Sequence, residues 1–256
     1  LAQSWFEEHY RPSRLTAVLV GDFDSARVKE WAERYFGRLG DAIADPKAEA
    51  RAPERDIEPS PPSVAEPVRQ TRSCECRSRV ELRYHSVPFG HVDAAALDVM
   101  AGLLAGRTGR LQKALVIDQG LAFSAGAQHA PLRLAGSFSV EAEAREGVAL
   151  DRLERSLFAE LARLREEPVG ERELQKVKNQ ITTEAARQVK EPLSLGLRLL
   201  VYDALGDWRH LYRWAELTDA VTAADVQRVA QRHLAPEGAS VLVLERERAA
   251  SMSRSP

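Results

Sequence analysis

The chain has 256 residues, of which 44% are hydrophobic and 29% are charged. This content is sufficient for one large core or two smaller ones, and it excludes a disordered protein. The 36 Lys and Arg residues nearly balance the 38 Asp and Glu residues, so no global field favours nucleic acid or an anionic membrane. The longest apolar stretches, residues 15–20 and 94–104, are shorter than the roughly 18 to 20 residues of a membrane span.

The first predicted elements are a strand and a helix. Residues 15–21, LTAVLVG, form a short apolar run rich in β-branched side chains, which predicts a strand. Asp22 or Asp24 is placed to cap the helix that follows, and Gly37 is placed to end it. The apolar residues at helical spacing are Val28, Trp31, Ala32, Tyr35 and Phe36.

A linker is predicted next, because proline and charge replace apolar periodicity from Asp45 to about Gln70. We therefore place a first structural part at residues 1–45 and the linker at 46–70. A second part, complete in itself, is expected at residues 71–248, and a disordered tail at 249–256. The chain begins at Leu1 without Met or a basic-then-apolar leader, so we expect a piece of a longer polypeptide.

The second part begins with strand and helix patterns in alternation. Residues 78–87 alternate apolar and polar side chains as a half-buried strand does, and residues 91–105 carry one apolar helical stripe that stops at Gly106. A short helix with Leu111, Ala114 and Leu115 follows a loop at residues 106–110. Two strands are predicted at residues 120–129 and 134–143.

The remainder is mostly helical. Thr222 and Asp225 are spaced as a capping box, which is a good start signal for the last helix. Strands grouped before a block of helices favour an α+β fold, with an antiparallel or mixed sheet packed by helices. The predicted helices cover residues 150–164, 174–185, 193–205, 208–217 and 223–234, and a final strand covers residues 240–245.

Cysteine and histidine patterns give no metal site or covalent nucleophile. Cys74 and Cys76 have a spacing that suits neither a relaxed disulfide nor a tetrahedral zinc site, and we interpret them as strand residues. His85 and His91 are the closest histidine pair, but Pro88 between them indicates a turn, and no cysteine or carboxylate completes a ligand set. No histidine pair has the zinc-protease spacing, and no Gly-x-Ser-x-Gly motif is present.

The loop GRTGR at residues 106–110 has three interpretations. A phosphate site requires Gly-x-x-x-x-Gly-Lys-[Ser/Thr] or Gly-x-Gly-x-x-Gly after a strand, and neither spacing is present. In a purely structural interpretation, Gly106 ends one helix, Thr108 caps the next, and the arginines face solvent. In a third interpretation, Arg107 and Arg110 bind carboxylates or carbonyls of an extended peptide near a sheet edge.

Three segments together resemble one family. Residues 6–39 resemble a "Tyr-x-Pro, apolar strand, Val-Gly-Asp, helix ending in Phe-Gly" segment. Residues 97–123 resemble a "Leu, Gly-rich turn, Arg-Leu, Leu-x-x-x-x-Gly-Leu-Ala-Tyr" signature. EPVGERELQKVKNQI and VTAADVQRVAQRHLAP resemble two later helices of the same family. In this order they are similar to the insulinase or pitrilysin family of inverted-zincin metallopeptidases, which includes mitochondrial processing peptidase and respiratory core subunits.

The resemblance implies that residues 1–45 are the end of a first peptidase-like domain and residues 71–248 a second, inactive one. In the family, the H-x-x-E-H zinc motif lies ahead of where this chain begins, so Glu7 and Glu8 are not interpreted as ligands. Val116 and Phe123 stand where family peptidases often have a substrate-holding arginine and tyrosine. Neither side chain polarises a carbonyl, because valine has no polar atom and phenylalanine lacks the hydroxyl.

Two functions follow from the resemblance. In the first, the chain is the non-catalytic half of a zinc peptidase and forms one wall of a peptide-binding chamber. The zinc is then held by an H-x-x-E-H domain or a homologous subunit, in a homodimer or heterodimer, and this chain carries no cofactor. In the second, the chain is a structural scaffold, as the respiratory core subunits are. The candidate substrate contacts are Arg107, Gly109, Arg110 and Phe123.

The resemblance leaves the substrate and the compartment open. An arginine-rich and alanine-rich chain is typical of a bacterium with GC-rich coding, and peptidases of this type occur in the bacterial periplasm and cytoplasm alike.

Overall fold

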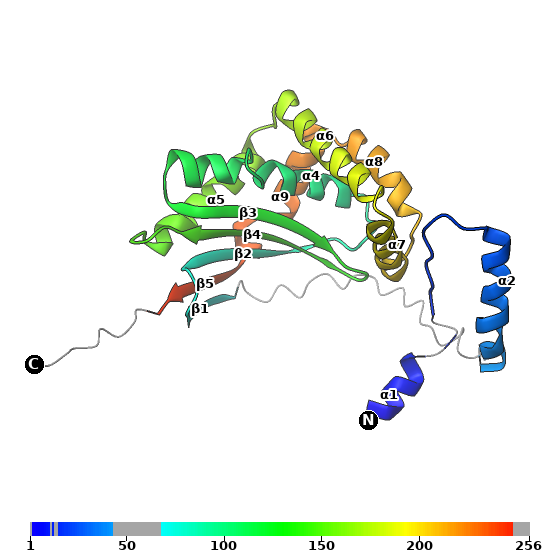
Figure 1. Cartoon of the computed structure of the whole chain (residues 1–256). Helices are drawn as coiled ribbons and strands as arrows, with labels where there is room; N and C mark the ends of the chain where they lie inside the picture. The colour runs from blue at the N-terminus through cyan, green and yellow to red at the C-terminus, as the bar shows by residue number, and fades with distance from the viewer. Residues whose placement is uncertain (1, 11, 13–14, 43–67, 248–256) are drawn as a thin grey trace, which may run out of the picture. The chain divides into compact units, whose positions relative to one another are not determined.

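A five-stranded mixed sheet forms one layer of the larger part of the chain, and helices lie on one side of it (Figure 1). The computed structural model describes residues 2–10, 12, 15–42 and 68–247. The strand order is β1-β5-β2-β4-β3, in which β1 is parallel to β5 and the other neighbours are antiparallel. The strands are β1 (Arg69–Cys74), β2 (Arg79–Ser86), β3 (Ala122–Pro131), β4 (Gly136–Ala144) and β5 (Ser240–Arg246).

The two faces of the sheet differ because side chains alternate along each strand. One face carries the core: Val80, Leu82 and Tyr84 of β2 are buried, and Phe138 and Val140 of β4 lie beside them. Helices α4 (Ala94–Leu104), α5 (Leu150–Glu166) and α9 (Ala223–His233) contact the strands and lie on one side of the sheet in Figure 1. The alternate positions of β2 and β4 carry polar side chains: Glu81, Arg83, His85, Ser137, Ser139, Glu141 and Glu143.

Helix α4 is buried on nearly all sides, and nine of its eleven residues belong to the core. A helix that is apolar all round belongs in a protein interior. Gly102 permits its close contact with the next layer, since a Cβ at this position would lie 2.6 Å from Val177 and 3.6 Å from Ile181. The other helical elements here are η3 (Gln112–Asp118), α6 (Glu171–Gln188), α8 (His210–Ala220) and η4 (Pro236–Gly238). No helix within the described residues is long and apolar enough to span a bilayer.

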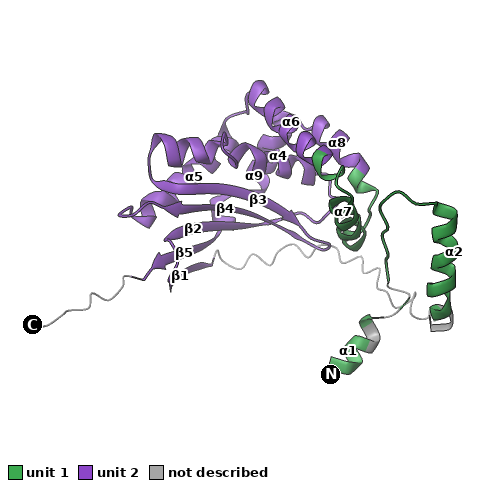
Figure 2. Cartoon of the chain, in the orientation of Figure 1, with its two compact units in different colours: residues 1–58, 187–211 green, residues 59–186, 212–256 purple. Residues whose placement is uncertain are grey.

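The chain divides into two compact units, which Figure 2 colours separately. One comprises residues 59–186 and 212–256 and contains the sheet. The other comprises residues 1–58 and 187–211. It contains α1 (Ala2–His9), α2 (Ser25–Phe36), η2 (Gly37–Ala42) and α7 (Pro192–Leu205). The domain boundaries expected from the sequence stay a prediction. Most of the expected linker and tail lies outside the described residues, and β1 begins at Arg69, within the range given to the linker.

The predicted strand at residues 15–21 is wrong. Residues 15–20 form no regular secondary structure, although their sequence has the right composition. A strand requires neighbours that satisfy its backbone groups, and none of the described strands pairs with this segment. It lies along α7 instead: Thr16 Oγ1 donates to Asp203 Oδ2 at 2.8 Å, and the side chain of Val20 lies near Gly196.

Most other predicted elements are confirmed, and so is the α+β fold class. Asp24 caps α2 by accepting hydrogen bonds from the backbone N–H groups of Ala26 and Arg27. Thr222 and Asp225 form the expected capping box of α9. The stripe predicted for α5 is buried at Leu153, Leu157, Leu161 and Leu164. Strands β2 to β5 and helices α4 to α9 lie within a few residues of their predicted bounds.

The expectation for the two cysteines is wrong in two respects, because they form a disulfide and because Cys76 lies in a bend after β1. Cys74 does end a strand, but it forms a disulfide with Cys76. Their Cα atoms are 5.1 Å apart, within the range of about 4.4 to 6.8 Å that disulfides occupy. Because the closed loop has so few residues, the chain-entropy relation gives this bond only on the order of 1.5 kcal/mol of global stabilisation. Its main effect is therefore local.

A buried carboxylate joins α4 to α9. Asp93 is 1% exposed, and it accepts a hydrogen bond from Arg228 Nη1 at 2.7 Å. Arg232 Nη1 lies 3.5 Å and His233 Nε2 3.7 Å from the other carboxylate oxygen. Burial alone raises the pKa of Asp93, but the Arg228 hydrogen bond and the nearby cations outweigh it and lower that pKa. Burial lowers the pKa of His233.

Acid is expected to destabilise this junction through His233. Because burial lowers the folded-state pKa of His233 below 6.5, its contribution to stability is complete above the unfolded-state pKa and is lost as the pH falls through the folded-state pKa. Denaturant unfolding at about pH 7.5 and about pH 5.5 measures this loss. His233→Gln is expected to reduce the difference, whereas His85→Gln, at an exposed histidine of β2, is expected to retain it. The same pH dependence in the wild type and His233→Gln would contradict this assignment.

Candidate functional site

A broad hollow lies at one end of the sheet, where β4 and β5 end and β2 and β3 begin. Its volume of about 1380 Å³ exceeds that of an ordinary small-molecule pocket, about 300 to 1,000 Å³, and suits an extended segment better. Three arginines, two glutamates and one aromatic ring contribute to its lining. The lining residues are Arg77, Ser78, Phe123, Ala144, Arg145, Glu146, Gly147, Val148, Ala149, Arg246 and Glu247.

Phe123 is presented to this hollow by a β-bulge. The register of β3 against β4 shifts between Ala122 and Ser124, so Phe123 is the additional residue. A bulge bends a strand and re-aims a side chain, and bulges are frequent beside functional sites. The ring is 57% exposed, and the guanidinium of Arg77 lies 3.9 Å from its centroid. This geometry is a cation–π contact, which leaves the rest of the ring accessible.

Arg145 holds the backbone at one position that the resemblance singles out, Val116, and at the residue before the other, Phe123. Its Nε donates to the carbonyl of Ala122 at 3.0 Å, and its Nη2 donates to the carbonyl of Val116 at 3.2 Å. Val116 lies in η3, which has π-helical geometry, so both positions occur in irregular backbone. Such π-helical turns are frequent at functional sites. The structure thus ties Val116, and Ala122 directly before Phe123, to the same guanidinium, a relationship that the sequence spacing did not reveal.

The GRTGR loop is a tight turn between α4 and η3. Gly106 has a φ of +80°, which confirms the expected helix stop, and Gly109 N–H donates to Gly106 C=O at 3.1 Å. Helical hydrogen bonding resumes at Gly109, whose carbonyl accepts from Lys113 N–H, and not at Thr108. Gly109 is buried, and a Cβ there would collide with the carbonyl oxygens of Leu104 and Ala105. The second glycine of the loop therefore serves close backbone packing.

The two arginines of the loop differ. Arg110 donates from Nε and Nη2 to the two carboxylate oxygens of Glu173 at 2.9 and 2.8 Å. The hydrogen bond to Glu173 raises the pKa of Arg110, and the nearby Glu160 and Glu167 act in the same direction. Arg107 is exposed, and its side chain has no hydrogen bond or ion pair within the described residues. Neither arginine lines the hollow that contains Phe123.

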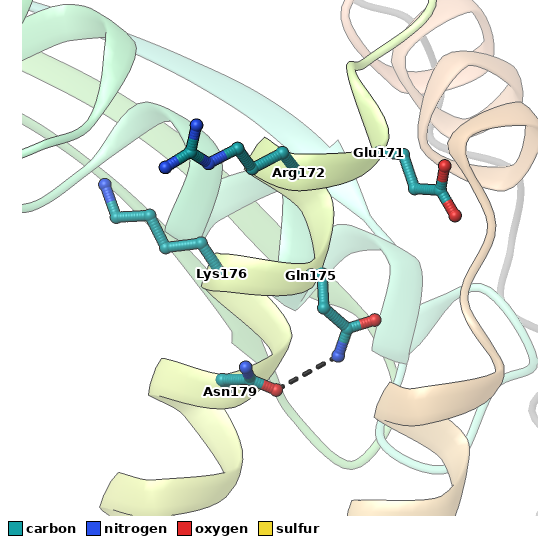
Figure 3. Close-up of a pocket in the computed structure, with 5 residues that line it drawn as sticks. All are labelled: Glu171, Arg172, Gln175, Lys176 and Asn179. Atoms are coloured by element: carbon teal, nitrogen blue, oxygen red, sulfur yellow. Dashed lines mark hydrogen bonds between the residues drawn. The ribbon is translucent and has the colours of Figure 1, made fainter.

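A second, shallow hollow follows the outer face of α6 (Figure 3). All five lining residues come from this one helix: Glu171, Arg172, Gln175, Lys176 and Asn179. Arg172 and Lys176 extend in the same direction, and Gln175 Nε2 donates to Asn179 Oδ1 at 3.0 Å. All five side chains are exposed. This surface has the character of a solvated helix face, because no group from another element converges on it.

The residues described here do not fit a zinc site. Among residues 2–42 and 68–247, leaving out the few that are not described, no three His, Cys, Asp or Glu side chains gather as a ligand set. The nearest arrangement is Asp93 with His91 and His233, at 4.0 and 3.7 Å. Arg228 and Arg232 bind the same carboxylate, so a further cation is unfavourable there. His129 is already bonded through Nδ1 to Asp98 at 2.7 Å.

The fold and the irregular backbone around Val116 and Phe123 define a class: an α+β domain with helices on one face of a mixed sheet. A comparison with family models matches residues 2–181 to the peptidase M16 inactive domain. The chain belongs to this family. A comparison with curated proteins gave no significant match.

Solved structures share this fold. A protease from Helicobacter pylori is 21% identical with a TM-score of 0.75, over 88% of this chain and 53% of that chain. The inactive peptidase domain of a protein from Bordetella parapertussis is 24% identical with a TM-score of 0.64, over 73% and 99% of the two chains. A chain of complex III from Candida albicans is 16% identical with a TM-score of 0.59, over 69% and 45%. This chain thus spans about half of the Helicobacter pylori protease.

Sequence reasoning missed the residues that organise the hollow. Arg77 contacts the ring of Phe123, and Arg145 donates to backbone carbonyls. Neither kind of contact produces a recognisable sequence motif. The one available signal was the segment Cys-Glu-Cys-Arg at residues 74–77, which places Arg77 directly after the paired cysteines.

Proposed function

We propose that this chain is the non-catalytic half of a zinc metallopeptidase and that it forms one wall of a peptide-binding chamber. An H-x-x-E-H domain or homologous subunit forms the opposite wall and holds the zinc. Membership of the peptidase M16 inactive-domain family supports this proposal. The observation that carries it furthest is the free edge of the sheet at β3, which has the features of a peptide-binding strand.

Between the bulge at Phe123 and Pro131, the β3 edge lacks the charged side chains that commonly protect an edge strand from pairing with another strand. Edge strands are commonly blunted by lysine, proline or other inward-pointing charges. From Phe123 to Ala130, β3 has no Lys, Arg, Asp, Glu or Pro, and residues 124–127 are Ser-Ala-Gly-Ala. Among the described residues, only β4 pairs with β3, so one row of the β3 backbone groups has no strand partner there. The opposite edge, β1, carries Arg69 and Arg72. Peptide addition to β3 therefore suits both the backbone and the small side chains.

The polar face of the sheet also suits a chamber wall. Antiparallel sheets often leave one face solvated, so polarity alone does not indicate function. Here the face carries both signs of charge, as in the pair of Glu81 and Arg83 at 2.6 Å. Such a surface offers donors and acceptors to a peptide without a strong preference for one charge. A general peptide-binding surface requires this property.

Backbone pairing is testable with modified peptides. In an assembly reconstituted from this chain and a zinc-bearing H-x-x-E-H partner, a cleaved peptide is compared with analogues N-methylated at alternate amides in one register or the other. The analogue methylated at the N–H groups that pair with β3 is expected to lose most of its turnover. The analogue methylated in the other register is expected to retain more of its turnover. Equal loss in both registers would contradict addition to β3. If the chain does not stimulate turnover by the partner at all, the scaffold function is favoured instead.

Arg107 is the loop arginine whose guanidinium has no partner in the part of the chain that the structure describes, and we predict that it contacts substrate. Arg107→Ala in the same assembly is expected to raise KM about tenfold, because a charge-assisted hydrogen bond contributes roughly 1.5 kcal/mol. Arg152→Ala removes another exposed arginine, from α5, and serves as the matched control. If KM for Arg107→Ala equals that for Arg152→Ala, the loop is purely structural.

A further inference from the structure

The Cys74–Cys76 disulfide lies in the turn that crosses the end of β5. Cys74 is the last residue of β1, and the chain reaches β2 at Arg79, on the other side of β5. Two backbone N–H groups at the end of β5 donate hydrogen bonds to this turn. Glu247 N–H donates to Cys74 C=O at 2.9 Å, and Arg246 N–H donates to Ser78 Oγ at 3.0 Å. The disulfide closes the part of the turn between these two attachments.

Arg77, the residue after Cys76, connects this turn to the hollow. Its guanidinium covers one face of the Phe123 ring at 3.9 Å. Its ion pair with Glu143 is long, at 3.9 Å, and Arg77 is 53% exposed. Side-chain contacts of this kind hold an arginine weakly, because solvent screens them. The position of Arg77 therefore depends mainly on the backbone that the disulfide constrains.

We propose that the Cys74–Cys76 disulfide is a redox switch that sets whether Arg77 covers Phe123. Both cysteines are half-buried, so a small thiol reaches them without unfolding the core. A short closed loop contributes little to global stability, so opening it changes the turn and leaves the fold intact. Two contacts depend on this turn, that of Arg77 with Phe123 and that of Ser78 with Arg246, and all four residues line the hollow.

A dithiol is the reductant in the proposed switch, because one molecule completes both exchange steps. A thiolate of the reductant attacks one cysteine sulfur, the sulfur–sulfur bond breaks, and a mixed disulfide forms. The second thiol of the reductant displaces the cysteine and leaves with the first as a disulfide. Two electrons and two protons pass to the protein, and Cys74 and Cys76 become thiols. Arg77 is then free to leave the ring, and more of Phe123 becomes accessible. That this changes peptide contact rests on the proposed function, whereas the switch itself does not.

Thiol counting and hydrogen exchange on the full chain test the switch. Chain isolated under air is expected to show no free thiol after denaturation and two after dithiothreitol, since the sequence has two cysteines. Amide exchange in peptides that cover residues 74–79 is expected to be about tenfold faster in the reduced state, as for a segment that opens locally. Peptides from α4 are expected to exchange equally in both states, which shows that the fold persists. Reoxidation is expected to restore slow exchange.

Two variants separate the switch from a general effect of reduction. Cys74→Ser with Cys76→Ser is expected to exchange at the reduced rate in both conditions. In the wild type, the reductant is also expected to change exchange at residues 121–124, because Arg77 contacts Phe123. Arg77→Ala is expected to leave the thiol count unchanged and to abolish this response. Two free thiols in air-oxidised chain, or equal exchange at residues 74–79 in both states, would overturn the proposal. Neither readout requires peptidase activity, so failure of the proposed function is recognised separately.

Discussion

Gly109→Ala is expected to lower the free energy of unfolding by about 3 kcal/mol, at the upper end of what overpacking costs. The reason is the identity of the neighbouring atoms. A Cβ at residue 109 would collide with the backbone carbonyl oxygens of Leu104 and Ala105, at the end of α4. A flexible side chain can rotate away from an added methyl group, whereas these carbonyls are fixed by the helix end, so the turn itself must shift.

Denaturant unfolding of both proteins measures this change. Gly126→Ala is the matched control, because a Cβ at residue 126 meets nothing within 4 Å and its φ is not in the left-handed region. We expect Gly126→Ala to be neutral or slightly stabilising, since glycine weakens a strand interior. If Gly109→Ala unfolds with the same free energy as Gly126→Ala, the loop is free to relax and its glycine has another purpose. That result would restore Gly109 as a candidate for substrate contact.

The regular elements of this fold were predictable from periodicity, because burial of one face repeats along the chain. In α5, the apolar stripe from Leu153 to Leu164 predicts the buried face of the helix. In β2, the alternation of Val80, Leu82 and Tyr84 predicts the buried face of the strand. The capping box at Thr222 and Asp225 was equally local, since both partners lie within four residues. Elements of this kind can be read from a short window.

The errors came from features that depend on distant residues. The apolar segment at residues 15–20 has the composition of a strand, yet it contacts α7, nearly two hundred residues later. Strand β1 reads as polar, and it becomes a strand because β5, at the end of the chain, pairs with it in parallel. A local sequence pattern cannot predict such distant partners.

The two-residue spacing of the cysteines did not predict a disulfide, although the chain at the end of β1 brings their Cα atoms within the range for one.

The candidate site was predictable only in part, for the same reason. The resemblance drew attention to Val116 and Phe123, and the structure shows Arg145 bonded to the carbonyls of Val116 and of Ala122, the residue before Phe123. Yet the reason that Phe123 faces the hollow is a bulge against β4, and a bulge has no signature in a single strand. Similarly, the sequence presented Arg107 and Arg110 as equivalent. Glu173, about sixty residues away, makes them different.

Arg110→Ala is expected to destabilise the chain by about 2 to 3 kcal/mol, somewhat less than the loss of one partner from a fully buried pair. The two hydrogen bonds from Arg110 hold Glu173, and its charge lies near Glu160, whose side chain is 5% exposed. Burial raises the pKa of Glu160, and Arg110 and Arg163 oppose that rise. Without Arg110, the cluster retains its carboxylates and loses its best-placed cation.

A double-mutant cycle with Glu173→Ala separates the pair from other effects of the substitution. We expect a coupling energy of roughly 1 to 2 kcal/mol, since the pair is bidentate and half-buried. The exposed pair of Arg155 and Asp151 in α5 is the control, with side chains 76% and 71% exposed, and its coupling is expected to be about 0.5 kcal/mol or less. If both pairs couple equally, Glu173 does not hold Arg110 in solution. Its guanidinium is then as available to a peptide as that of Arg107, and the substrate contact that we propose for Arg107 extends to both arginines of the loop.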